Sequence, residues 1–143
     1  MVGILLVTHN GLGDSLADCV RHVLGAVPAH LMVLSVLADD DPGKKEAEGR
    51  ALIAGLDTGS GVLILCDVFG ATPGNIALRL LEKGRVEGVA GVNLPMLLRA
   101  VTCGREKGLA EARQRALDGG RDCIVFMDQE AKGCDVATRR ADH

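Results

Sequence analysis

Aromatic residues are almost absent from this chain of 143 residues, which contains two phenylalanines and no tryptophan or tyrosine. The sequence therefore lacks the stacking surfaces that bind unpaired bases and the aromatic rings that commonly enclose a flavin. The formal net charge is −3, and no segment concentrates basic residues. On electrostatic grounds we expect no nucleic-acid partner and no attraction to anionic membranes.

Long apolar runs are also missing, since none approaches the roughly 20 residues that cross a bilayer. The apolar N-terminal run is short and has no basic leader, so it predicts a buried strand rather than a signal peptide. We expect a soluble, cytoplasmic protein without direct membrane insertion. The five cysteines are odd in number and lack CxxC spacing. This argues against a disulfide framework or a zinc site and favours buried free thiols.

Apolar runs of strand length alternate with amphipathic segments of helix length along most of the chain. Strands are predicted at residues 2–7, 31–36, 61–66, 86–92 and 123–127. Helices are predicted at 15–24, from the Asp39-Asp40-Asp41-Pro42 run to 56, from Thr72-Pro73 onwards, and from 95 to 117 with a break near Gly104. Thr72 is the expected N-cap of its helix, with Pro73 at the first helical position. We interpret the three aspartates as a helix cap and solvated loop rather than a metal site.

The strands are rich in Val, Ile and Leu with little alternation, which is typical of strands buried on both faces. We therefore expect an α/β fold with a mostly parallel, doubly wound sheet and helices on both faces. The expected order is the flavodoxin-like 2-1-3-4, plus a last edge strand. Residues 1–128 form the expected domain, and the polar, non-periodic residues 129–143 are predicted to be a disordered tail.

The candidate site lies beyond the carboxyl ends of the strands, where such folds bind their ligands. The first strand leads to His9, the third to Asp67 and the fourth to Asn93. In the order 2-1-3-4 the first and third strands are neighbours, so His9 and Asp67 should meet. The other histidines, His22 and His30 among them, are interpreted as ordinary surface or rim residues.

A histidine beside a carboxylate has a chemical use. The carboxylate accepts a hydrogen bond from one ring nitrogen and leaves the other free to attack an electrophile. An arriving phosphoryl group would find donors in the Thr72 hydroxyl and in free N–H groups near Gly74 and Asn75. From spacing alone, the alternative that His9 is only a polar loop residue stays open.

Three segments resemble the IIA domain of the mannose/fructose family of the bacterial phosphoenolpyruvate-dependent sugar phosphotransferase system. They read ILLVTHNGLGDSL, GVLILCDVFGATPGNIA and VAGVNLPMLL, and the resemblance covers about residues 2–127. It implies that His9 is the phosphorylated histidine, that Asp67 orients it, and that the Thr72 hydroxyl lies near the phosphoryl group. It also implies a crevice that binds the transferred group or the partner, lined by Asn10, Gly70, Ala71, Pro73, Gly74, Asn93 and Pro95.

The resemblance further implies a phosphotransferase that accepts phosphate from HPr and passes it to a IIB domain for sugar uptake. It implies a homodimer with the last strand at the subunit contact, and no metal or organic cofactor. Five positions depart from the family pattern: Asn10 and Ala71 replace glycine, Thr72 replaces serine, and Val68-Phe69 replace a more polar-aromatic pair. These changes leave the choice of partner open, and a regulatory phosphocarrier without its own transporter is the alternative.

Three other classes fit less well. A receiver domain would be phosphorylated on Asp67, but it needs an acid pair after its first strand and a lysine where this chain has Asp128. A flavodoxin would need aromatic residues and a run of hydroxyl residues. A homologue that has lost the transfer chemistry and serves only in binding is disfavoured by the joint presence of His9, Asp67 and Thr72.

Overall fold

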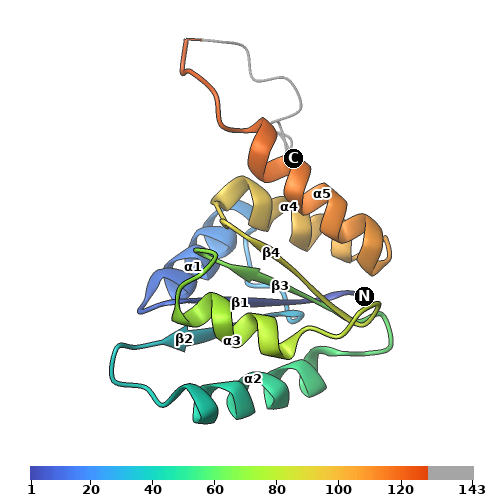
Figure 1. Ribbon diagram of the computed structural model, residues 1–143. Helices are drawn as coiled ribbons and strands as arrows, with labels where there is room; N and C mark the ends of the chain where they lie inside the picture. The colour runs from blue at the N-terminus through green and yellow to red at the C-terminus, as the bar shows by residue number, and fades with distance from the viewer. Residues whose placement is uncertain (129–143) are drawn as a thin grey trace.

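The computed structural model describes residues 1–128 and contains a four-stranded parallel sheet in the order β2-β1-β3-β4 (Figure 1). The strands are β1 Gly3–His9, β2 Leu31–Val36, β3 Val62–Cys66 and β4 Val86–Ala90. The helices are α1 Leu12–Leu24, α2 Pro42–Leu56, α3 Thr72–Leu80, α4 Leu94–Gly104 and α5 Leu109–Asp122. The predicted fold class and strand order are confirmed.

The core divides into two layers because successive side chains of a strand point to opposite faces of the sheet. In the central strand β1, Ile4 and Leu6 pack with the apolar faces of α1, α4 and α5. Leu5 and Val7 point the other way and pack with α2 and α3. All four side chains are fully buried. Figure 1 shows the two helix layers on either side of the sheet, with the carboxyl ends of the strands directed to the left.

The predicted last edge strand is wrong for this chain taken alone. Residues 123–127 form no strand, and Ile124 and Phe126 are each 75% exposed while Met127 is fully exposed. A strand needs a neighbour for its backbone hydrogen bonds, and this segment leaves α5 in a direction away from the sheet (Figure 1). The sequence thus contains an apolar run at 123–127, but no strand in residues 1–128 pairs with it.

Several element ends differ from the predicted ones. Helix α1 begins at Leu12 rather than Ser15, α5 continues to Asp122, and β4 ends at Ala90. The N-cap of α3 is Ala71, so Thr72 is already the first helical residue. The acidic cap of α2 is confirmed, since the Asp41 side chain accepts a hydrogen bond from the Lys44 amide at 3.0 Å.

Two predictions about burial also need correction. His30 is buried, with 8% of its surface exposed, and its ring Nε2 lies 3.4 Å from the carbonyl oxygen of Val101 in α4. Cys66 is a buried free thiol as predicted, but Cys19 is exposed and Cys123 is disulfide-bonded.

None of the helices in residues 1–128 is long and apolar enough to cross a membrane. The predicted tail, 129–143, lies outside the described residues.

Candidate functional site

His9 is the last residue of β1, the strand that pairs with β2 on one side and β3 on the other. Its ring Nδ1 lies 2.8 Å from Oδ2 of Asp67, and its backbone amide donates to the same oxygen at 3.0 Å. The predicted meeting of His9 and Asp67 across the two neighbouring strands is therefore confirmed. The His9 side chain is 45% exposed and that of Asp67 is 7% exposed, so the acid lies behind the histidine.

Asp67 is held as a carboxylate by its surroundings. Burial alone would raise its pKa, but the hydrogen bonds from the His9 amide and ring, the charge of His9 and the Val68 amide together lower the pKa below the ordinary value for an aspartate. The Val68 amide donates to Oδ1 at 2.9 Å. Both oxygens are thus engaged, and the position of the carboxyl is fixed by the backbone on both sides of it.

This geometry selects one tautomer of His9. An ionised carboxylate only accepts hydrogen bonds, so Nδ1 carries the proton and Nε2 has a free electron pair. Within residues 1–128 no hydrogen bond reaches Nε2. The arrangement can therefore present an oriented, half-exposed nitrogen nucleophile to a group arriving from solvent.

The backbone around His9 is shaped by its neighbours. Asn10 has a left-handed φ of 49°, which asparagine tolerates, and its amide donates to the carbonyl of Val36 at 3.0 Å. Thr8 is fully buried and its Oγ1 accepts from the Gly13 amide at 2.8 Å, which ties the end of β1 to the first turn of α1. The sequence reading assigned Thr8 no role; a hydroxyl inside an otherwise apolar run was the available signal.

The turn from β3 to α3 supplies unpaired amides beside the His9–Asp67 pair. Gly70 has a left-handed φ of 90°. The amides of Gly70, Ala71, Thr72 and Gly74 donate to no other group in residues 1–128, as expected for a helix start. Asn75 is different, because its amide donates to the Ala71 carbonyl at 2.9 Å. The expectation of a free N–H at Asn75 is therefore wrong.

The other predicted residues of α3 have packing roles that the structure makes visible. Gly74 is buried, and a Cβ there would lie 2.7 Å from the Val68 carbonyl oxygen, so the turn and the helix can only close over a glycine. Pro73 is buried and Thr72 is exposed. The Thr72 hydroxyl has no hydrogen-bond partner among residues 1–128.

Asn93 and Pro95 lie at the same end of the sheet, but their contacts point elsewhere. Oδ1 of Asn93 accepts from the Met96 amide at 3.0 Å, which caps α4. Its side-chain nitrogen donates to the Gly120 carbonyl at 2.9 Å and joins α4 to α5. Pro95 is the second residue of α4. The hydrogen bonds of Asn93 in residues 1–128 thus cap α4 and tie it to α5, and none of them goes to His9.

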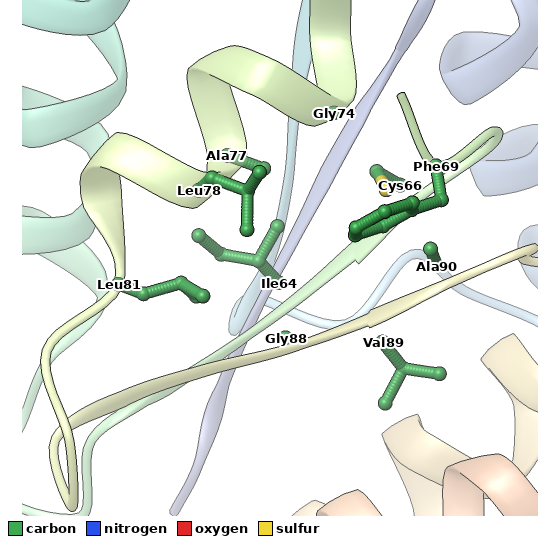
Figure 2. A pocket seen from close by; sticks show the side chains of 10 residues that line it. All are labelled: Ile64, Cys66, Phe69, Gly74, Ala77, Leu78, Leu81, Gly88, Val89 and Ala90. Carbon is green, nitrogen blue, oxygen red and sulfur yellow. The ribbon is translucent and has the colours of Figure 1, made fainter. Parts of the chain in front are cut away.

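An apolar hollow of about 130 Å³ opens beside the site, between α3 and the edge of β4 (Figure 2). Sequence reasoning did not anticipate it. Figure 2 shows the Phe69 ring next to Cys66 at one end of the hollow and Leu81 at the other. Burial raises the pKa of the Cys66 thiol, as does the negative charge of Asp67, so this sulfur stays protonated. The hollow is lined by Ile64, Cys66, Phe69, Gly74, Ala77, Leu78, Leu81, Gly88, Val89 and Ala90.

The protein family described as "PTS system fructose IIA component" matches residues 3–117, which include the whole sheet, His9 and Asp67. The chain belongs to this family. The mannose-specific EIIAB component of the phosphotransferase system from Escherichia coli K12 is 31% identical over 98 residues. That match covers 68% of this chain and 30% of the relative, so the chain spans less than a third of that protein's length.

Solved structures of IIA components have the same fold. The EIIA component from Streptococcus agalactiae superposes with a TM-score of 0.79 at 18% identity, covering 88% of this chain and 97% of that one. The mannose/sorbose-specific IIA subunit from Enterococcus faecalis gives a TM-score of 0.77 at 21% identity, with coverages of 90% and 96%. At these identities the likeness shows the fold alone.

Proposed function

We propose that this protein is a phosphocarrier that accepts a phosphoryl group on Nε2 of His9. The observation that carries the proposal is the contact between Nδ1 of His9 and the buried Asp67 carboxylate. It fixes the proton on the inner nitrogen and leaves the outer, solvent-facing nitrogen free to react. Membership of the IIA family supports the same role.

In the transfer step, the electron pair on Nε2 forms the new bond to phosphorus while the bond from phosphorus to the donor breaks. The leaving atom of the donor departs with that bonding pair, so the phosphoryl group moves without a change of oxidation state. The proton on Nδ1 stays in its hydrogen bond to Asp67, which stabilises the positive charge that develops on the ring. No further proton transfer is needed at His9.

The phosphoryl oxygens need donors, and the turn after β3 offers them. The amides of Gly70, Ala71 and Gly74 and the hydroxyl of Thr72 have no other partner in residues 1–128. Helix α3 adds the partial positive charge of its N-terminus. We assign these groups to binding the transferred phosphoryl group. In this assignment Pro73 shapes the turn, and Asn10, next to His9, lines the opposite side of the site.

We assign the donor as phosphorylated HPr and the acceptor as a IIB domain that serves sugar uptake, with the exchange taking place in the cytoplasm. This assignment rests on the family and on the resemblance of the site segments. A regulatory role would use the same chemistry at His9. The two roles differ in the acceptor: a transport component passes its phosphoryl group to a IIB domain, whereas a regulator has no IIB acceptor.

We also propose that two copies of the chain associate through the apolar segment that follows α5. Ile124, Val125, Phe126 and Met127 are all more than 40% exposed, and β4 is a sheet edge with an apolar hollow beside it. The segment of one copy would add to the β4 edge of the other. Sedimentation should give a dimer for the native chain and a monomer for the Ile124→Ser/Phe126→Ser double variant.

Incubation with phosphoenolpyruvate, enzyme I and HPr tests the central proposal. One phosphoryl group per chain should be incorporated, and the label should be labile in acid and stable in base, as a phosphoimidazole is. His9→Ala should take up no label, while His22→Ala should take it up at the native rate because His22 is an exposed residue of α1.

A base-labile label would instead indicate an acyl phosphate on Asp67 and would overturn the proposal. The geometry opposes that outcome, because both Asp67 oxygens already accept hydrogen bonds and its side chain is 93% buried by its neighbours (7% exposed). Uptake of label by His9→Ala at the native rate would also overturn the proposal.

A further inference from the structure

Cys123 takes part in a disulfide bond that the proposed phosphoryl chemistry does not use. The other cysteines of residues 1–128, which are Cys19, Cys66 and Cys103, are free. The sequence contains five cysteines, so the one that remains to pair with Cys123 is Cys134, which lies outside the described residues. The count of thiols thus points to a bond between Cys123 and Cys134.

Cys123 lies at the junction between the last helix and the exposed apolar segment, residues 124–127. It directly follows α5, and its amide donates to the carbonyl of Arg121 at the end of that helix. All four residues of the apolar segment are more than 40% exposed. Figure 1 shows this part of the chain leaving α5 in a direction away from the sheet. A bond at Cys123 therefore acts where the segment begins its path towards a second copy of the chain.

A bond between Cys123 and Cys134 encloses the apolar segment in a ring of twelve residues. An extended strand advances about 3.3 Å per residue, and the two Cα atoms of a disulfide lie roughly 5.5 Å apart. The ring can therefore extend over about half of its residues before the chain has to return to the bond. The returning half then lies beside the apolar segment and competes with the β4 edge of a second copy for the backbone groups of the segment.

Reduction opens the ring and removes this competition. Strand β4 is at the edge of the sheet, so one side of its backbone is available to an added strand. The apolar hollow between α3 and β4 lies beside that edge and can receive apolar side chains of the segment. Burial of side chains such as Ile124 and Phe126, each 75% exposed in the single chain, stabilises the association.

The bond is open to exchange with small thiols and disulfides. Cys123 is partly exposed, and Asp122 and Ile124 on either side of it are exposed. The proposed exchange of phosphoryl groups takes place in the cytoplasm, where a disulfide is usually transient and serves catalysis or redox sensing.

We propose that the bond between Cys123 and Cys134 is a redox switch for the association of two copies. The disulfide form holds the apolar segment in a ring and favours the monomer, whereas the dithiol form releases the segment and favours the dimer. The oxidant is a low-molecular-weight disulfide of the glutathione class. This inference rests on the association of two copies proposed above and not on the chemistry at His9.

The oxidation proceeds by two exchanges between thiolates and disulfides. The Cys123 thiolate attacks one sulfur of the small disulfide, forms a mixed disulfide and releases one small thiolate. The Cys134 thiolate then attacks the Cys123 sulfur and displaces the second small thiolate. The protons lost by the two cysteines pass to the two released thiolates, so two thiols of the chain are oxidised while the small disulfide is reduced to two thiols.

Sedimentation equilibrium of the full chain in glutathione buffers of defined ratio tests the switch. With the thiols reduced, the native chain should be a dimer. With oxidised glutathione in excess, the dissociation constant of the dimer should rise about tenfold, because the ring restricts the contacts of the segment. Trypsin cleaves after Lys132, so the oxidised chain should yield peptides 122–132 and 133–139 joined by a disulfide, as measured by mass spectrometry.

Cys123→Ser and Cys134→Ser should form the dimer equally well in both buffers, because each variant removes the bond and keeps the apolar segment. Cys19→Ser is the matched control, since Cys19 is an exposed and free cysteine of α1. It should respond to the buffers as the native chain does. Circular dichroism verifies that all three variants are folded.

The outcomes separate this proposal from the association on which it rests. If the native chain is a monomer in both buffers, the association proposal fails and the switch fails with it. If the native chain dimerises equally in both buffers while the linked peptides are recovered, the switch is overturned and the association stands. If oxidation strengthens the dimer, or joins two copies covalently on a non-reducing gel, the switch is likewise overturned.

Discussion

The two ends of the sheet each hold a histidine, and the surroundings of the two side chains are opposite. At the carboxyl end, the His9 side chain is 45% exposed and its inner nitrogen is bound by a carboxylate at 2.8 Å. At the amino end, His30 is buried and its Nε2 lies 3.4 Å from the carbonyl oxygen of Val101. Burial lowers the pKa of His30, and the nearby charges of Arg105 and the N-terminus act in the same direction.

The backbone at the two ends follows the same contrast. At the amino end, the amides of Val2, Gly3 and Ile4 donate to the carbonyls of Gly104, Gly61 and His30 at 2.8–3.0 Å. At the carboxyl end, the turn after β3 keeps several amides without partners among the described residues. One end satisfies its polar groups internally and stabilises the fold, whereas the other keeps them available for a ligand.

The largest effect that tests this comparison is the exchange of each histidine for glutamine. His9→Gln should abolish phosphoryl uptake, because an amide nitrogen has no free electron pair to attack phosphorus. His30→Gln should keep the native rate once its folding is verified by circular dichroism. If His30→Gln loses the label while folded, the assignment of the two ends is wrong.

Asp67→Asn should lower the rate of phosphoryl uptake about 100-fold, a loss typical of removing one oriented charged partner from a reaction centre. An asparagine keeps the size of the side chain but can turn its NH₂ towards His9, which would leave the wrong ring nitrogen protonated. Single-turnover labelling measures the rate. A change of less than threefold would mean that the 2.8 Å contact does not orient His9 for reaction.

Much of this comparison follows from the sequence. The apolar runs ending at His9 and Cys66 predict buried parallel strands, and parallel order alone brings His9 and Asp67 to one edge. The sequence does not predict which local contact a polar side chain takes. Asn93 serves as the cap of α4, whereas Thr72, the predicted cap of α3, is instead the first residue of that helix. Which residue caps a helix depends on packing between distant segments, and the local sequence pattern does not encode that packing.

The predictions for residues 123–127 and for His30 are wrong for the same kind of reason. A run such as Cys-Ile-Val-Phe-Met has strand propensity, but a strand forms only where a neighbouring strand accepts its hydrogen bonds. His30 precedes β2 in a polar-looking context, and its burial comes from Val101, which is 71 residues away in the sequence. Contacts between distant segments decide both cases.

Thr8→Val should lower the free energy of unfolding by about 1–3 kcal/mol, because the fully buried hydroxyl is the partner of the Gly13 amide and its loss leaves that donor unsatisfied. Thr8→Ser keeps the oxygen and should cost less. Urea titration measures both. Equal stability of the valine and serine variants would show that the Gly13 contact does not secure the start of α1.

The smallest effect is a pH dependence of stability that comes from two groups, one at each end. The folded chain holds the pKa of His30 below its ordinary value of 6.5. The unfolded state therefore binds more protons as the pH falls below about 6.5, and the free energy of unfolding should decrease there. Asp67 has a lowered pKa, so the stability it contributes is present above about 3.8 and is lost as the pH falls through its folded value.

The two pH windows can be separated by variants. His30→Gln should flatten the decline that begins below about pH 6.5 and leave the decline below about pH 3.8 in place, whereas Asp67→Asn should flatten the more acidic decline and leave the other in place. Urea titrations at several pH values give the two slopes, each less than one proton. If both variants alter the same window, the two histidine environments are coupled through β1, and the ends of the sheet are not independent in the way that their contacts indicate.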